Sequence, residues 1–190
     1  MRPFWAYESV TSIYSNKPLK YARIEEERRF LLSKMPADLN PDDPFVRIID
    51  FYIEGTRLRL RRIESPEKDT LVYKFGQKYR SADLKTHQTM MTNFYLNEAE
   101  YEVLARLPHS TLIKQRYAYP RDGFNYSLDR FEDHLAGLLL AEIESRGKLD
   151  ITRLPVPQFA IKEVTDDPFF TGSHLAGISQ REFQEWLASL

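Results

Sequence analysis

Residues 24–31 read Ile-Glu-Glu-Glu-Arg-Arg-Phe-Leu, and residues 140–144, near the other end of the chain, read Leu-Ala-Glu-Ile-Glu. In an extended strand, side chains two residues apart lie on the same face. Each stretch therefore predicts a strand that presents two carboxylates side by side: Glu25 with Glu27, and Glu142 with Glu144. Carboxylates gathered without partners repel each other, so we expect a cationic group to join them.

A basic stretch between these two segments can supply such charge. Residues 56–61 read Thr-Arg-Leu-Arg-Leu-Arg, which places Arg57, Arg59 and Arg61 on one face of a strand. Lys74 and the pair Lys114 and Arg116 follow at strand spacing. Acidic groups suit a metal ion and basic groups suit a polyanion, so the two patterns together predict one site that takes both.

The same alternation with a period of two continues along most of the chain. It predicts strands at residues 22–32, 46–54, 56–64, 70–76, 88–96, 110–119, 123–131, 138–145 and 160–165. Capping boxes at Asn97 with Glu100, and at Ser179 with Glu182, predict the starts of two helices. Residues 1–20 show no clear period and predict an irregular N-terminal arm, whereas 21–190 predict a single domain that includes the C-terminal helix.

Successive antiparallel strands with short turns and few helices favour an α+β, mainly antiparallel β, fold that curls into an up-and-down barrel. Closure would direct the polar residues of several strands into a shared lumen. On this interpretation the lumen is lined by Glu25, Glu27, Arg29, Arg57, Arg59, Arg61, Lys74, Lys114, Arg116, Asp129, Glu142 and Glu144.

Composition narrows the classes of partner. The chain has 190 residues and a net charge of −1, with 27 Lys plus Arg against 28 Asp plus Glu, so no global basic field favours nucleic acid. Cysteine is absent, which fits a reducing compartment, and we expect a cytoplasmic protein. No stretch approaches the roughly 20 apolar residues that span a bilayer, so we expect no membrane association. The sequence does not indicate whether the chain forms oligomers.

These motifs, in this order, resemble the CYTH superfamily, also called the triphosphate tunnel metalloenzymes. The opening Glu-x-Glu-x-Lys signature of that family resembles residues 25–29, where Arg29 stands in place of the lysine. Further landmarks follow in order over about residues 21–178: Arg-Leu-Arg-Leu-Arg at 57–61, Lys74, Lys-Gln-Arg-Tyr at 114–117, Leu-Asp at 128–129, Leu-Ala-Glu-Ile-Glu at 140–144, Glu-Val-Thr-Asp-Asp-Pro at 163–168 and Ser-His-Leu-Ala at 173–176.

The resemblance implies an eight-stranded antiparallel tunnel that is closed or nearly closed, with a few peripheral helices. Its basic side chains would hold a small-molecule triphosphate and its glutamates Mg²⁺ or Mn²⁺. Members of the family hydrolyse inorganic tripolyphosphate, nucleoside triphosphates or thiamine triphosphate, or cyclise ATP. We expect hydrolysis of tripolyphosphate here, with two alternatives: a class IV adenylate cyclase, or a module that binds triphosphate or polyphosphate without turnover.

The resemblance also assigns roles to the charged residues. The expected metal ligands are Glu25, Glu27, Glu142 and Glu144. The expected substrate ligands are Arg29, Arg57, Arg59, Arg61, Lys74, Lys114 and Arg116. Lys114 would also protonate or stabilise the leaving phosphate, and Glu25 or Glu144 would orient the attacking water. Asp129 is expected either to support one of the phosphate-binding arginines or a metal-bound water, or to face solvent at a hairpin turn.

Two departures from the family pattern affect this assignment. An arginine at position 29 keeps the charge but replaces a compact ammonium with a planar fork, so the geometry of the site is expected to shift. Many hydrolytic members carry Glu-x-Glu on the strand before the central helix, where this chain has Met91 and Asn93. Those acids would orient basic residues, and their absence bears on the rate and on whether the chain turns over its ligand at all.

Overall fold

The structure is a computed structural model that describes residues 21–40, 42–79, 87–145 and 150–189. The predicted arm at 1–20 lies outside the described residues. The strands are β1 (Arg23–Leu31), β2 (Phe45–Ile53), β3 (Leu58–Ser65), β4 (Thr70–Tyr79), β5 (Gln88–Leu96), β6 (His109–Arg121), β7 (Phe124–Phe131), β8 (Leu139–Ser145) and β9 (Lys162–Glu163). The α-helices are α1 (Glu98–Leu104), α2 (Gly172–Gly177) and α3 (Gln180–Leu187). The short 3₁₀ turns are η2 (Pro66–Lys68), η3 (Asp133–Leu135), η4 (Ile151–Arg153) and η5 (Pro168–Phe170).

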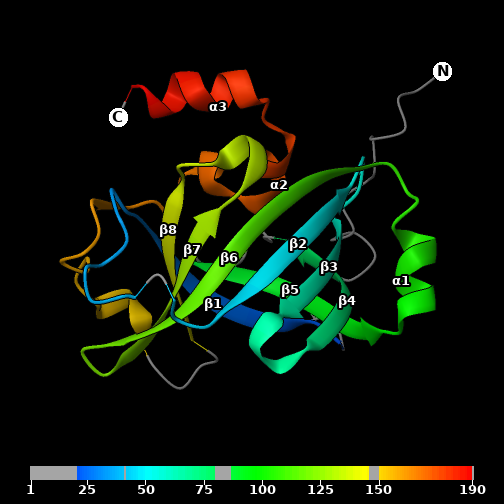
Figure 1. The fold of residues 1–190 in the computed structure, drawn as a ribbon, viewed down its shortest axis with the longest axis horizontal. Helices are drawn as coiled ribbons and strands as arrows, with labels where there is room; N and C mark the ends of the chain where they lie inside the picture. The colour runs from blue at the N-terminus through cyan, green and yellow to red at the C-terminus, as the bar shows by residue number, and fades with distance from the viewer. Residues whose placement is uncertain (1–20, 41, 80–86, 146–149, 190) are drawn as a thin grey trace, which may run out of the picture.

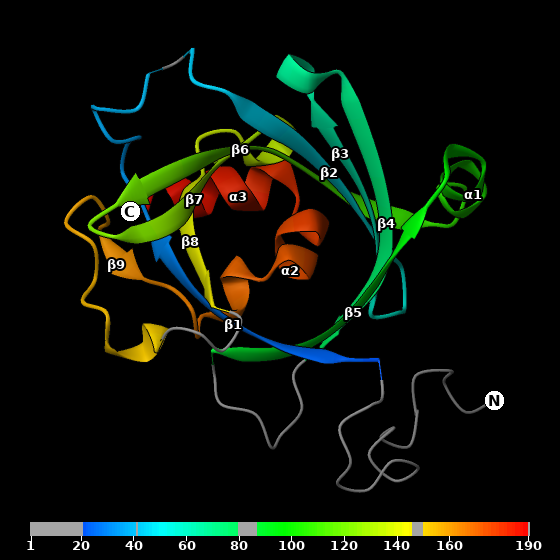
Figure 2. The ribbon, with the colours of Figure 1, turned by 90° about the horizontal axis from the view of Figure 1, so that it is seen from below.

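Eight of these strands form a closed antiparallel barrel. Their order is β5-β4-β3-β2-β6-β7-β8-β1, and pairing of β1 with β5 closes the ring (Figure 2). The short strand β9 is added outside the ring along the end of β1, at Phe30 and Leu31. The predicted antiparallel barrel is confirmed. The strand boundaries agree closely with the alternation in the sequence, except that β4 continues to Tyr79 beyond the predicted end at residue 76, and that only Lys162–Glu163 of the last predicted strand is extended.

The inside of the barrel changes from apolar to charged along its length. At one end, inward side chains of four strands pack against the buried Phe170 and Leu175 of η5 and α2; these strand residues are Leu31, Leu112, Phe131 and Leu140. Figure 2 shows α2 within the ring of strands when the barrel is viewed along its axis, and Figure 1 shows α3 outside it at the same end. The apolar cluster leaves the middle and the opposite end of the barrel for charged residues.

Both predicted capping boxes are present. The Asn97 side chain accepts from the Glu100 amide at the start of α1, and the Ser179 side chain accepts from the Glu182 amide at the start of α3. Each glutamate in turn accepts from the cap residue's amide, which satisfies two helix-end groups at once. Helix α3 holds the end of the barrel through the buried Phe183, whose ring stacks with that of Trp186.

Helix α2 was not predicted as a helix. It is short, has no side-chain cap, and depends on a close approach to the barrel wall. A Cβ atom at Gly172 would come within 1.9 Å of the Tyr52 hydroxyl oxygen, so only glycine fits this position without a shift of the tyrosine. Among the described residues, no helix is long and apolar enough to cross a membrane.

Candidate functional site

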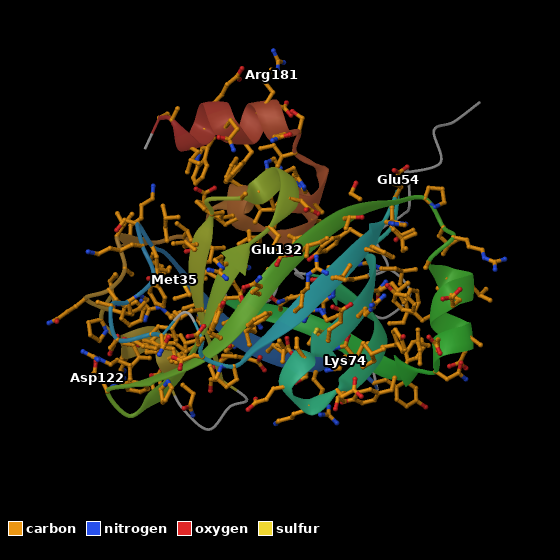
Figure 3. All side chains as sticks on the ribbon, viewed as in Figure 1. Met35, Glu54, Lys74, Asp122, Glu132 and Arg181 are labelled. Carbon is orange, nitrogen blue, oxygen red and sulfur yellow. The ribbon has the colours of Figure 1, made fainter. Side chains whose placement is uncertain are left out.

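A cavity of about 740 Å³ occupies the interior of the barrel. Its lining includes every residue predicted for the site except Asp129: Glu25, Glu27, Arg29, Arg57, Arg59, Arg61, Lys74, Lys114, Arg116, Glu142 and Glu144. Figure 3 labels Glu54, at the upper end of β2, and Lys74, nearer the lower rim of the barrel. The period of two explains the shared lining, because alternate residues of each strand face the lumen.

The two acidic segments are neighbours in the sheet. Strands β1 and β8 pair so that Glu27 lies opposite Glu144 and Arg29 lies opposite Glu142. The four glutamates therefore lie along one side of the lumen. Burial raises the pKa of the Glu25 carboxyl, and the nearby Glu144 raises it further. Burial and a neighbouring like charge both disfavour the ionised form of a carboxyl group.

Asp129 lies directly behind two of the basic residues. It is 0 % exposed, and its Oδ2 atom accepts from Lys114 Nζ at 2.5 Å and from Arg116 Nη2 at 2.6 Å. Its Oδ1 atom accepts from Arg116 Nε at 2.6 Å, and Arg116 also contacts Glu142. The Asp129 side chain thus orients Lys114 and Arg116 and does not face solvent at the hairpin.

Lys114 experiences opposing influences. Burial and the neighbouring Arg116 lower the pKa of its ammonium, although Asp129 and Glu142 act in the other direction. Burial acts to raise the pKa of Glu142, but Lys114 and Arg116 outweigh it and hold that pKa well below its usual range. Lys114 is therefore a cation that gives up its proton more readily than an ordinary lysine.

Asp50 of β2 supports the arginine strand, and sequence reasoning missed it. It is 1 % exposed and accepts from Arg61 through two bonds, Nε to Oδ1 at 2.6 Å and Nη2 to Oδ2 at 2.7 Å, while Arg59 Nε lies 3.8 Å away. Burial acts to raise the pKa of Asp50, but the two arginines lower it to about 2. The available signal was a lone acid inside the apolar stretch at 48–53.

Lys78 is the second residue that sequence reasoning missed. Its Nζ atom donates to Glu27 Oε2 at 2.7 Å, and it lines the cavity. The predicted strand ended at residue 76, whereas β4 continues to Tyr79, so Lys74 and Lys78 face the same lumen. A glycine at 76 interrupts the alternation, and the structure supplies a reason for it: a Cβ there would meet Asn93 Oδ1 at 1.9 Å.

Arg29 lies at the boundary between the charged lumen and the apolar end. Its Nη2 atom donates to Glu27 Oε1 at 2.7 Å, and its Nη1 atom donates to the carbonyl oxygen of Phe170. The residue is 7 % exposed, and its buried Nε has no hydrogen-bond partner among the described residues. Burial acts to lower the pKa of Arg29, but Glu27 and Glu142 keep it raised. Arg29 thus links β1 to the segment that enters α2.

The strand that precedes α1 contributes no acid to the lumen among the described residues. Thr89, Met91 and Asn93 line the cavity from β5, and Met91 Sδ lies 4.0 Å from Arg59 Nη2. The neighbouring strands supply the basic residues of this side of the lumen, Arg59 from β3 and Lys74 from β4. Lys74 Nζ lies 5.3 Å from the centre of the Tyr95 ring, and the described residues give it no ion pair.

The glutamate side of the lumen has the chemistry of a divalent-metal site. Carboxylate oxygens are the ligands that Mg²⁺ and Mn²⁺ prefer, and a bound cation would offset the repulsion between Glu25 and Glu144. Among the described residues, no three His, Asp or Glu side chains are yet arranged to hold an ion. The donor set fits, and ligation would require side chains to turn toward the ion.

No family model and no curated protein matches the sequence. Solved structures do match. The structure of the hypothetical protein NE1496 aligns with a TM-score of 0.55 at 22 % identity, over 82 % of this chain and 99 % of that one. The structure of the inorganic triphosphatase NE1496 aligns with a TM-score of 0.52 at 21 % identity, over 80 % of this chain and 93 % of that one.

At these identities the likeness establishes the fold. The closed eight-stranded antiparallel barrel of this chain superposes on a structure described as an inorganic triphosphatase. The chain therefore has the CYTH-like tunnel fold that its sequence motifs predicted.

Proposed function

We propose that this chain is a divalent-metal-dependent triphosphatase that hydrolyses inorganic tripolyphosphate inside the barrel. The observation that carries the proposal is a single buried lumen in which glutamates of β1 and β8 face a wall of arginines and lysines. The name of NE1496, an inorganic triphosphatase with the same fold, supports the same reaction class.

The basic residues would bind the phosphate chain. Phosphoryl transfer requires mainly positioning and neutralisation of charge, which buried guanidinium and ammonium groups provide. Asp50 fixes Arg61, and Asp129 fixes Lys114 and Arg116, so these side chains are oriented before the ligand arrives. The proposed phosphate ligands are Arg57, Arg59, Arg61, Lys74, Lys114 and Arg116.

We expect Glu25 and Glu144 to hold a divalent ion. Glu27 and Glu142 lie beside them and already contact cationic side chains. A bound Mg²⁺ or Mn²⁺ supplies charge neutralisation and lowers the pKa of a coordinated water toward neutrality.

In the proposed reaction, the oxygen of water forms a bond to a terminal phosphorus, and the bond from that phosphorus to the bridging oxygen breaks. The products are orthophosphate and pyrophosphate. Glu25 or Glu144 orients the water and receives its proton. Lys114 either donates a proton to the leaving pyrophosphate oxygen or stabilises the negative charge on that oxygen. The lowered pKa of Lys114 suits it to donate.

The test is phosphate release from tripolyphosphate and from ATP with Mg²⁺, with Mn²⁺ and with chelator, together with a measurement of cyclic AMP. Release from tripolyphosphate that exceeds release from ATP and stops in chelator is the expected result. Formation of cyclic AMP from ATP would instead identify a cyclase.

A second candidate, a module that binds triphosphate without turnover, is favoured by one observation. The lumen face of β5 carries the uncharged residues Thr89, Met91 and Asn93, so among the described residues this strand supplies no acid to orient Lys74 on the neighbouring β4. Measurable binding of tripolyphosphate with no product from any substrate would establish this candidate.

A further inference from the structure

Glu27 is engaged through both oxygens of its carboxylate. It is 8 % exposed, and each of its carboxylate oxygens accepts from a different cation: Oε1 from Arg29 Nη2 at 2.7 Å, and Oε2 from Lys78 Nζ at 2.7 Å. Charge-assisted bonds of this length are among the stronger hydrogen bonds in proteins. Both oxygens are thus engaged before any ligand enters.

Lys78 reaches Glu27 across an intervening strand. It belongs to β4, Glu27 belongs to β1, and β5 lies between the two strands. The residue paired with Lys78 on β5 is Met91, which has no charge to offer. The lumen-facing residues of β5 that the structure describes near it, Thr89 and Asn93, are also uncharged. Lys78 therefore takes its counter-ion from β1.

The other cation on Glu27 is anchored as well. Arg29 Nη1 donates to the carbonyl oxygen of Phe170, and the Arg29 amide donates to Thr165 Oγ1 at 3.0 Å. Glu27 is thus part of a chain of contacts that runs from Lys78 to the segment entering α2. Rotation of its carboxylate toward a metal would break contacts with two cations and would bring a third positive charge close to them, which Coulomb repulsion opposes.

On the basis of the triphosphatase proposed above, we propose that Glu27 is a positioning residue and not a metal ligand. It holds Lys78 over the uncharged wall of β5, and Lys78 contacts the bound phosphate chain there. The divalent ion is then held by carboxylates other than Glu27. Glu27, the second acid of the Glu-x-Glu pair, thus supports the phosphate-binding Lys78 in this chain.

The first experiment measures Mn²⁺ affinity by electron paramagnetic resonance in the substrate-free protein. Glu27→Gln should bind Mn²⁺ within about threefold of the parent, whereas Glu144→Gln should lose about tenfold or more, because it would replace a charged metal ligand with a neutral one. Equal losses in the two variants would overturn the proposal, because Glu27 would then be a ligand as well.

The second experiment measures tripolyphosphate affinity by calorimetry in chelator. Lys78→Gln should bind at least about tenfold more weakly, as expected for loss of one charged hydrogen bond, and Lys78→Arg should restore most of the affinity. Unchanged affinity in Lys78→Gln would overturn the proposal. This variant leaves the contact between Glu27 and Arg29 in place, so it tests the idea even where Glu27→Gln folds poorly.

A double-variant cycle links the two residues. If Glu27 acts through Lys78, the KM of Glu27→Gln/Lys78→Gln for tripolyphosphate equals that of Lys78→Gln alone, since the second change removes support for an absent group. Independent, additive effects would overturn the link. The two binding experiments do not require turnover. A protein that releases no phosphate would refute the proposed function, and the Mn²⁺ affinities would still decide whether Glu27 is a metal ligand.

Discussion

Arg61 and Asp50 form a two-bond ion pair across β3 and β2, in which the carboxylate is almost completely buried. Removal of one partner from such a pair leaves an uncompensated buried charge. Asp50→Asn should therefore lower the free energy of unfolding at pH 7 by about 3 kcal/mol, measured by urea denaturation. Asp122→Asn, at an exposed turn position, is the matched control and should change it by less than about 0.5 kcal/mol.

The pH dependence of this difference follows from the pKa of Asp50, which is about 2 in the folded protein against an ordinary value of 3.8. Because the folded pKa is the lower one, the stabilisation is fully present above the ordinary value and is lost as the pH falls through about 4 toward 2. The gap between parent and variant should be smaller at pH 3 than at pH 7. A gap that does not narrow would contradict the assignment.

Glu144→Gln should abolish metal-dependent phosphate release while the fold stays intact. The variant keeps the shape of the side chain and removes the charge that would hold the ion beside Glu25. Phosphate release with Mg²⁺ and thermal melting are the two measurements. Glu102→Gln, an exposed acid on α1, serves as the control. Turnover equal to that of the parent would remove Glu144 from the metal site.

Arg59→Ala should weaken tripolyphosphate binding by about tenfold or more, because one charged hydrogen-bonding group of the lumen is lost. Calorimetry in chelator isolates this contribution from that of the metal. Arg62→Ala is a matched control on the same strand, since Arg62 is absent from the cavity lining and pairs with Glu64. Equal losses in the two variants would mean that general positive charge, and not the lumen position, governs binding.

Lys114 predicts an alkaline limb in the rate profile. Its pKa is lowered by burial and by Arg116, so the protonated form is lost at a pH below the ordinary 10.5 of lysine. The rate of tripolyphosphate hydrolysis should fall as the pH rises through that pKa. In Lys114→Arg, whose guanidinium stays charged, the alkaline limb should move to higher pH. An unchanged limb would assign the ionisation to another group.

The barrel could be predicted from the sequence because each strand carries a strong contrast between its two faces. Charged residues at alternate positions of 25–29, 57–61 and 140–144 face the lumen, and apolar residues between those of the last two stretches, such as Leu60 and Ile143, are buried on the other face. A closed sheet with a polar inside makes this alternation unusually clear. The register of β1 against β8 depends on pairing over a long sequence separation, which no local pattern contains.

The supporting residues were harder to predict. Asp50 is a single acid in an apolar strand, so it forms no repeat, and Lys78 lies beyond a glycine that interrupts the alternation. Asp129 was placed only as one of two alternatives, since its burial depends on a neighbouring strand. Helix α2 lacks a capping signal, and its position depends on contact with Tyr52 of the barrel wall.

The apolar packing of α2 against Leu31, Leu112, Phe131 and Leu140 bears on how a ligand enters and leaves the lumen. Because these side chains fill one end of the barrel as far as the described residues show, we expect a phosphate chain to enter the lumen from the opposite end and its products to leave by that same end. Product release and binding of the next substrate molecule would then use the same opening, so the rate of product release would limit how soon the next molecule can bind.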